Sequence, residues 1–167
     1  STWVSNVRSA RERGATCVLM HMQGSPGSMQ SNPVYVDVVR DVADFLRERV
    51  DAALAVGVDR RRIWIDPGIG FGKTLEHNLE LLVRLPELLE LGLPICLGVS
   101  RKSFIAALES ASKAPPSAAE ARLGGSAAAV ALGVLGGATI LRVHDVAVMA
   151  QAARVAKSFR EMRGRRT

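Results

Sequence analysis

The hydrophobic positions of this chain follow two patterns that alternate along the sequence. Short apolar runs have the length of buried strands, and between them hydrophobic residues recur every three or four positions, as on one face of a helix. These patterns predict strands at residues 16–20, 63–65, 95–99 and 139–143. They predict helices at 5–13, 35–56, from about 78 with a break at Pro86, for about two turns after 103, at 118–135 and at 146–162.

Polar residues stand at or just beyond the C-terminal end of every predicted strand. Strands that alternate with helices predict a parallel sheet with right-handed crossovers, and ligand sites of such sheets gather at the carboxyl ends of the strands. We therefore expect one shared site. Its candidate residues are His21, Asp66, Ser100, Lys102, Arg142 and His144.

The fold class that this pattern favours is α/β, and the placement of the polar residues matches the catalytic rim of a TIM (β/α)8 barrel. Four strand–helix units are only half of such a barrel, which typically needs ~250 residues. A doubly wound open sheet is the alternative architecture. The chain of 167 residues is expected to form a single domain over 1–167.

A glycine-rich loop, Asp66–Lys73, follows the second predicted strand. Pro67 ends the strand, and glycines at alternate positions allow backbone angles that bring N–H groups close to a ligand. A strand-to-helix turn needs only one glycine, so a ligand cradle is a better interpretation than a simple turn. The spacing matches neither the phosphate loop that ends in Gly-Lys-Ser/Thr nor the dinucleotide fingerprint.

The formal net charge of +6 and the sequence pI of about 10.1 raise the question of nucleic-acid binding. The basic residues concentrate in Arg60–Arg62 and in the C-terminal tail, without aromatic residues between them that could stack on bases. Solvated surface is the better interpretation of these clusters. A positive field would also favour an anionic substrate.

The sequence also argues against a membrane protein and against secretion. The longest weakly polar stretch, 126–141, is shorter than the ~20 residues that a bilayer span requires, and the N-terminal residues lack the regions of a secretory signal. Cys17 and Cys96 fall in predicted strands, where we expect small buried side chains and no disulfide. A reducing cytoplasm is the expected location.

Four ordered motifs resemble one family, the dihydropteroate synthases of folate biosynthesis. The motifs are Leu19–Gly24, Asp66–Lys73, Ser100–Ser103 and Arg142–Asp145. The resemblance implies a pterin-binding (β/α)8 barrel that joins 6-hydroxymethyl-7,8-dihydropterin pyrophosphate to p-aminobenzoate, with Mg²⁺ present, and releases pyrophosphate. It also implies inhibition by sulfonamides, which mimic p-aminobenzoate, and a homodimer formed through the last helices of the barrel.

The chain resembles only the last four strand–helix units of that barrel, beginning in the helix before the fifth strand. In the family, the first four units carry an Asn near the pyrophosphate and metal, two mobile loops, and an Asp and an Asn for the pterin. None of these has a counterpart in this sequence. We therefore expect no metal ligand from this chain, and we expect the chain alone to be inactive.

For the pterin, the resemblance implies contacts from several of the residues already singled out. Asp66 would accept hydrogen bonds from the amino group and the ring N–H as a bidentate pair, and Lys102 would reach the ring carbonyl and ring nitrogen. The alternatives are a helix N-cap for Asp66, an exposed side chain for Lys102 and ordinary core packing for Met20. The implied pterin-binding residues are Met20, Asp66, Gly70, Phe71, Lys102 and Arg142.

For p-aminobenzoate, the resemblance implies a hydrogen bond from Ser100, a wall formed by Phe71 and a further contact from Lys102. Ser100 could equally be a helix N-cap. Arg142 and His144 are two residues apart on one predicted strand and so face the same side, where they would hold the pyrophosphate. Lys102, Arg142 and His144 are the candidate catalytic residues.

Two other functions fit the sequence. A pterin-binding methyltransferase that carries methyltetrahydrofolate to a corrinoid would use a similar aspartate, but it has no need of the Ser100–Ser103 motif. A non-catalytic half-barrel that associates through its apolar helices should have lost polar residues at the strand ends, and these are intact. His21 is placed among the strand-end residues without a specific role.

Overall fold

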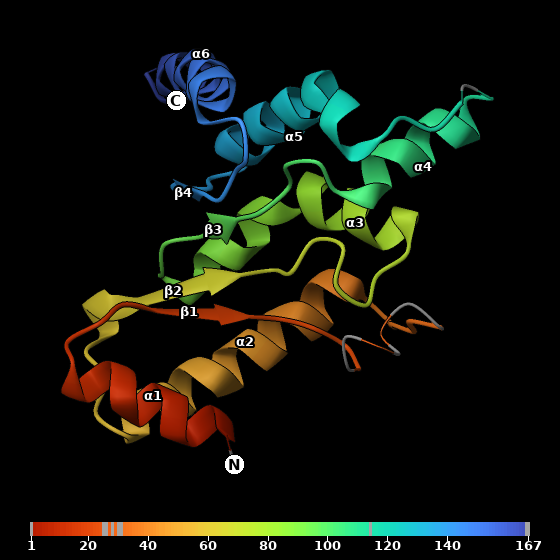
Figure 1. The fold of residues 1–167 in the computed structure, drawn as a ribbon. Helices are drawn as coiled ribbons and strands as arrows, with labels where there is room; N and C mark the ends of the chain where they lie inside the picture. The colour runs from red at the N-terminus through yellow and green to blue at the C-terminus, as the bar shows by residue number, and fades with distance from the viewer. Residues whose placement is uncertain (1, 25–26, 28, 30–31, 114, 166–167) are drawn as a thin grey trace.

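The computed structural model describes residues 1–167 except 1, 25–26, 28, 30–31, 114 and 166–167, so the connection between β1 (Cys17–Met20) and α2 (Val38–Ala55) is described only in part. Short parallel strands alternate with helices through the chain (Figure 1). The strands are β1 (Cys17–Met20), β2 (Ile63–Asp66), β3 (Cys96–Leu97) and β4 (Ile140–Leu141). Each corresponds to one of the apolar runs that predicted a strand.

The strands lie side by side in the order of the sequence. β1 pairs with β2 in parallel, with Met20 opposite Asp66, and β3 pairs with β4 in parallel. A parallel bridge between Ile65 and Ile95 joins the two pairs. A doubly wound sheet would reverse its strand order at a switch point, whereas the order β1-β2-β3-β4 is that of one side of a barrel. The architecture is therefore α/β with the topology of a half-barrel.

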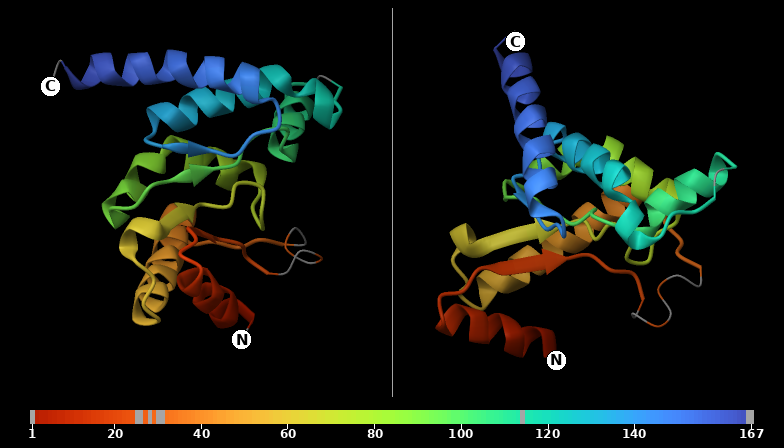
Figure 2. Two further views of the ribbon diagram at one scale, coloured as in Figure 1. Left: turned by 60° about the vertical axis from the view of Figure 1, so that its left-hand side comes forward. Right: turned by 45° about the horizontal axis from the view of Figure 1, so that its top comes forward.

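Helices and short 3-10 turns connect the strands. Figure 2 shows α6 lying across α5 at one end of the molecule and α1 at the opposite end. The α-helices are α1 (Thr2–Glu12), α2 (Val38–Ala55), α3 (Leu75–Val83), α4 (Ser103–Ala111), α5 (Leu123–Leu135) and α6 (Val146–Gly164). The 3-10 turns are η1 (Arg60–Arg62), η2 (Leu85–Leu91) and η3 (Ala119–Ala121).

Two helices begin where a side chain caps them. The carboxylate of Asp37 accepts hydrogen bonds from two N–H groups of the first turn of α2, so this helix begins later than predicted. α3 begins after Thr74, earlier than predicted, because Thr74 and His77 form a reciprocal capping box. The sequence prediction missed this box because its second member is His rather than the usual Glu or Gln.

Other boundaries also differ from the prediction. The helix expected at 118–135 is divided into η3 and α5. The break expected at Pro86 is present: α3 ends at Val83, and Pro86 lies in the first turn of η2. β3 and β4 are shorter than the apolar runs that predicted them. β4 ends at Leu141, so Arg142 and His144 follow the strand and do not lie on it.

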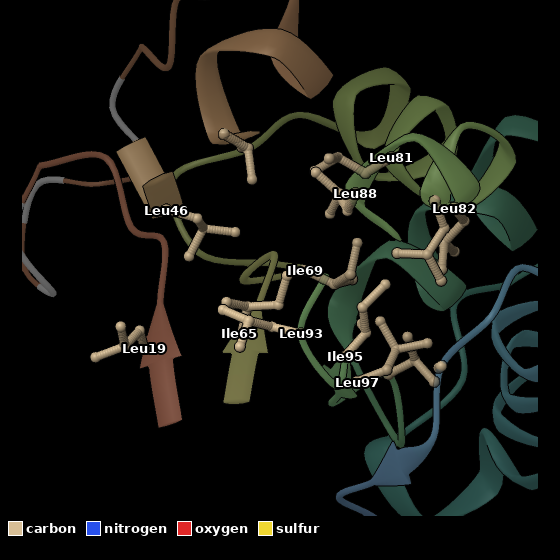
Figure 3. Packing of buried hydrophobic residues seen from close by; sticks show 14 of the residues in the cluster. Leu19, Leu46, Ile65, Ile69, Leu81, Leu82, Leu88, Leu93, Ile95 and Leu97 are labelled. Atoms are coloured by element: carbon tan, nitrogen blue, oxygen red, sulfur yellow. The ribbon is translucent and has the colours of Figure 1, made fainter. Parts of the chain in front are cut away.

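The hydrophobic core lies between the strands and the helices that cover them (Figure 3). Ile65 and Ile95 meet at the bridge that joins the two strand pairs, and both are fully buried. Leu46 of α2 and Leu81 of α3 are fully buried in the same cluster. Burial of each such side chain stabilises the fold by roughly 1.5–3 kcal/mol.

Glycines allow α5 to pack closely on its neighbours. A Cβ on Gly125 would lie 2.4 Å from Cγ2 of Ile105, and one on Gly133 would lie 2.2 Å from Cδ2 of Leu97. Gly124, in contrast, has open space around it.

The arginines of η1 are exposed, but they also tie segments together. Arg60 donates a hydrogen bond to the carbonyl of Leu91 (2.7 Å), and Arg62 donates one to the carbonyl of Gly14. These contacts give part of the basic cluster a structural role. Across the described ranges, no helix is both long enough and apolar enough to cross a membrane.

Candidate active site

Asp66 ends β2 and is nearly buried, with 3% of its surface exposed. Its Oδ1 accepts a hydrogen bond from the N–H of Gly68 at 2.7 Å, so the glycine loop begins by folding back onto the carboxylate. Thr74 caps the helix that follows the loop. The N-cap alternative for Asp66 is therefore wrong.

The glycines of the loop adopt the left-handed backbone region that disfavours side chains, with φ of +69° at Gly68, +80° at Gly70 and +63° at Gly72. A Cβ on Gly68 would lie 1.8 Å from the carbonyl oxygen of His21, and one on Gly72 would lie 2.5 Å from that of Gln23. The glycines therefore let the loop pass directly against the chain that leaves β1.

Lys73 is buried behind this loop, with 3% of its surface exposed. Its Nζ lies 2.9 Å from Nδ1 of His21 and donates hydrogen bonds to the carbonyls of Gly68 and Phe71, both at 3.0 Å. The ammonium group thus has three acceptors within the protein. His21, which is 6% exposed, also packs edge-on against Phe45. Lys73 and His21 support the loop from behind.

Two further side chains fasten the loop. Oδ1 of Asn78 accepts a hydrogen bond from the N–H of Gly70 at 2.7 Å, and the Asn78 amide donates to the carbonyl of Thr74, also at 2.7 Å. The hydroxyl of Tyr35 donates to the carbonyl of Gly72 at 2.6 Å. The loop backbone is therefore held from both flanks before any ligand binds.

Lys102 approaches the glycine loop from the start of α4. Its Nζ lies 3.9 Å from the centre of the Phe71 ring, and its Cδ would be 3.3 Å from a Cβ on Gly70. Lys102 and Phe71 are both half-buried, so the alternative of an exposed side chain for Lys102 is wrong. Met20 is half-buried at the end of β1, opposite Asp66.

Arg142 and His144 lie against the segment that follows β3, Arg142 at Gly98 and His144 at Ser100. A Cβ on Gly98 would lie 2.9 Å from Nη2 of Arg142, so the guanidinium lies over this glycine. Oγ of Ser100 lies 3.2 Å from Nδ1 of His144 and accepts a hydrogen bond from its backbone N–H at 3.3 Å. Lys102 holds the N-cap position of α4, so the N-cap alternative for Ser100 is wrong.

The site combines one buried carboxylate with several cations. Burial raises the pKa of Asp66, and the N–H of Gly68 and the positive charges of Arg142, Lys102 and Lys73 act against this rise. Burial, together with Arg142, lowers the pKa of Lys102, and burial lowers the pKa of Lys73 to about 7. Such a site suits a ligand that offers N–H donors to the carboxylate and carries an anionic group.

Reasoning from the sequence missed the residues that support the site. The structure brings Asp66, Lys102 and Arg142 together, as predicted from their strand ends. Asn78 and Tyr35 carry no sequence signal, because their partners in the loop lie 8 and 37 residues away. For Lys73, the only signal in the sequence was its position as the last residue of the glycine-rich motif.

A family model described as pterin binding enzyme matches residues 4–144. The dihydropteroate synthase of Neisseria meningitidis serogroup C is 48% identical over 144 residues, which cover 86% of this chain and 49% of that protein. A structure of Yersinia pestis dihydropteroate synthase in a complex with a sulfonamide drug superposes with a TM-score of 0.86 at 36% identity, covering 93% of this chain and 55% of that one. A structure of Xanthomonas albilineans dihydropteroate synthase with 4-aminobenzoic acid superposes with a TM-score of 0.80 at 42% identity, covering 92% of this chain and 52% of that one.

The chain spans about half the length of the curated relatives it matches. Because the family model covers most of the chain and the matching structures share its fold, this chain belongs to the family of pterin-binding enzymes.

Proposed function

We propose that the protein is a dihydropteroate synthase, which joins 6-hydroxymethyl-7,8-dihydropterin pyrophosphate to p-aminobenzoate and releases pyrophosphate. The observation that best supports this is the buried carboxylate of Asp66, which lies near Lys102 and Arg142 at one end of the parallel strands. The relatives in complexes with a sulfonamide drug and with 4-aminobenzoic acid support the choice of the second substrate.

In this proposal the pterin binds at Asp66. The amino group and the adjacent ring N–H donate to the two oxygens of the carboxylate, and the N–H of Gly68 already orients Oδ1 for this. Lys102 donates to the ring carbonyl, and Met20 packs on the ring from the end of β1. Gly70 leaves the space that Lys102 occupies beside the loop.

The second substrate lies between the glycine loop and the start of α4. Phe71 forms a wall for the aromatic ring, Lys102 makes a further contact, and Ser100 donates a hydrogen bond to the carboxylate of p-aminobenzoate. Arg142 and His144 hold the pyrophosphate, with the planar guanidinium as a forked donor. These roles assign every predicted site residue except His21 and Gly70 to a group of the substrates.

The chemistry needs no nucleophilic side chain. The electron-rich pterin ring can expel pyrophosphate and leave a delocalised cation, which the amine of p-aminobenzoate then attacks. Lys102, Arg142 and His144 would stabilise the negative charge that develops on the leaving group, while Asp66 and Phe71 orient the two reactants. The positive charges of Arg142, Lys102 and Lys73 near Asp66 fit these roles, because they would attract the anionic leaving group.

The Mg²⁺ that the resemblance implies does not fit the described side chains. Outside the masked positions, no group of three or more His, Cys, Asp or Glu residues could hold a metal ion. Asp66 stands near three cations, which would repel a divalent ion. No step proposed here depends on a metal ligand from these residues.

We further propose a homodimer and a reducing, cytoplasmic location. Apolar side chains on the exposed face of α6 support self-association, and they are Val148, Val155, Phe159 and Met162. Cys17 and Cys96 are both free and buried, and burial raises the pKa of both thiols, which keeps them protonated. We also propose that residues 1–167 belong to a single domain.

The experiment that tests this function is pterin binding by Asp66→Asn in a complete barrel, in which this chain is combined with a polypeptide that carries the first four strand–helix units of a related synthase. An amide can accept only one of the two N–H groups and turns a donor toward the other, which costs ~1–3 kcal/mol, or about fivefold to 150-fold in affinity. Asp59→Asn, at the opposite end of β2, is the matched control. Calorimetry should show a large loss for Asp66→Asn alone, and equal affinities would refute the role of Asp66. Competition by p-aminobenzoate separates a synthase from a methyltransferase.

A further inference from the structure

Arg101 stands between two proposed site residues and has an unusual backbone. Its φ is +59°, in the left-handed region that residues with a side chain rarely occupy. Such a conformation persists only where the surrounding structure holds it in place. Because Arg101 lies between Ser100 and Lys102, its backbone angles decide where both of those side chains point.

The backbone N–H and the backbone carbonyl of Arg101 both form hydrogen bonds with residues at the start of α5. Its N–H donates to Oγ of Ser126 at 2.9 Å, and its carbonyl accepts a hydrogen bond from Nη1 of Arg122 at 3.0 Å. Ser126 is fully buried, and its hydroxyl donates in turn to the carbonyl of Arg122 at 2.6 Å. The left-handed turn is thus fixed from the helix behind it.

The side chain of Arg101 makes a bidentate ion pair with Asp145. Nη2 lies 2.7 Å from Oδ1, and Nε lies 3.1 Å from Oδ2. Asp145 occupies the N-cap position of α6, where an aspartate usually bonds to N–H groups of the first helical turn, yet its side chain makes no such bond. The carboxylate is directed to Arg101 instead.

We propose that the Arg101–Asp145 pair is a positioning device that keeps the two halves of the site in register. Arg101 is flanked by Ser100 and Lys102, and Asp145 directly follows His144, so one ion pair joins the loop after β3 to the loop after β4. The contact between Ser100 and His144 depends on that junction. The catalytic consequence of this role rests on the proposed function, whereas the positioning itself does not.

The test compares variants that break the pair without adding strain. Arg101→Gly removes the side chain and accepts the positive φ without cost, and Asp145→Asn keeps the shape of the side chain but loses its charge. Ser126→Ala removes the hydroxyl that accepts the N–H of Arg101. Its matched control is Ser158→Ala, because the hydroxyl of Ser158 also bonds to the carbonyl four residues earlier but lies far from the loop in the chain.

The readout is the imidazole nitrogen resonances of the three histidines by NMR. In Arg101→Gly, Asp145→Asn and Ser126→Ala we expect the His144 Nδ1 resonance to move, because the contact with Ser100 is lost. The His21 and His77 resonances should stay in place, and the thermal midpoint of Arg101→Gly should remain within a few degrees of wild type. An unmoved His144 resonance in folded Arg101→Gly and Asp145→Asn would overturn the proposal.

Activity of the same complete barrel provides a second readout. If both proposals hold, Arg101→Gly should lower kcat by about tenfold or more with KM little changed, since misplacement of reacting groups impairs the chemical step. Full activity in this variant would remove the catalytic consequence of the pair. A complete barrel with the wild-type chain that makes no dihydropteroate would instead refute the proposed function, and the His144 resonance would still decide the positioning role.

Discussion

His21 and Lys73 show how a buried polar pair can support a binding loop without touching a ligand. Lys73 has three acceptors within the protein, and one of them is the imidazole of His21. Burial and the nearby ammonium of Lys73 lower the pKa of His21 to about 4. The imidazole is therefore neutral at physiological pH, and it can accept the hydrogen bond from Lys73 only in that form.

This pair predicts a loss of stability in mild acid. The pKa of His21 is lower in the folded chain than in the unfolded one, so the unfolded chain binds more protons between pH 6.5 and about 4. The free energy of unfolding should fall across that window, by roughly 2 kcal/mol at pH 5. His21→Asn keeps an acceptor near the position of Nδ1 but does not titrate. Urea unfolding should show a smaller acid loss in the variant, and identical losses would contradict the assignment.

Gly68 predicts a severe effect from a single methyl group. Alanine at this position would have to adopt φ of +69° and would place its Cβ 1.8 Å from the carbonyl oxygen of His21. We expect Gly68→Ala to lower the free energy of unfolding by roughly 3 kcal/mol or more. Gly124→Ala is the control, because Gly124 has open space in a helix and gains up to ~1 kcal/mol from alanine. Comparable unfolding midpoints for the two variants would contradict this explanation.

Among the elements, the helices differ in how their first turns are satisfied. α2 and α3 have side-chain caps, whereas α4 begins at the site without a side-chain cap. Asp37 also forms an ion pair with Arg84 at 3.1 Å, which links the start of α2 to the end of α3. The hydrogen bonds with Arg84 and with the first turn lower the pKa of Asp37 to about 2. These contacts secure the helices on either side of the glycine loop.

The capping box of α3 predicts a measurable contribution from Thr74. Thr74→Ala removes the acceptor for the N–H of His77, so it should lower the free energy of unfolding by ~1 kcal/mol. Ser103→Ala, at the first position of α4, is the control because no side chain caps that helix. Chemical denaturation of both variants provides the comparison. An equally small effect at the two positions would indicate that the box contributes nothing.

At the scale of the whole molecule, the sheet and the last helix leave apolar surface uncovered. Val18 of β1 is 46% exposed, and Phe159 of α6 is 63% exposed. Strand edges and apolar faces of this kind favour association with another polypeptide. The expected partner of α6 is a second copy of this chain.

Self-association through α6 can be tested at Phe159. We expect the wild-type protein to sediment as an oligomer at micromolar concentration. Phe159→Lys should shift the equilibrium toward monomer, because it places a charge in the apolar stripe that includes Val155 and Met162. Ser158→Lys adds the same charge at a neighbouring exposed position and should leave the oligomer intact. A monomeric wild-type protein would count against this interface.

The sequence by itself determined the alternation of strands and helices and the residues at the strand ends, because hydrophobic periodicity and turn chemistry are local properties. It also identified the glycine loop, since several positive φ angles close together in a loop favour glycine at those positions. Only the tertiary structure decided which of these residues touch. Lys73 meets His21 across 52 residues and Arg101 meets Asp145 across 44, and the parallel pairing of the strands brings such distant positions together.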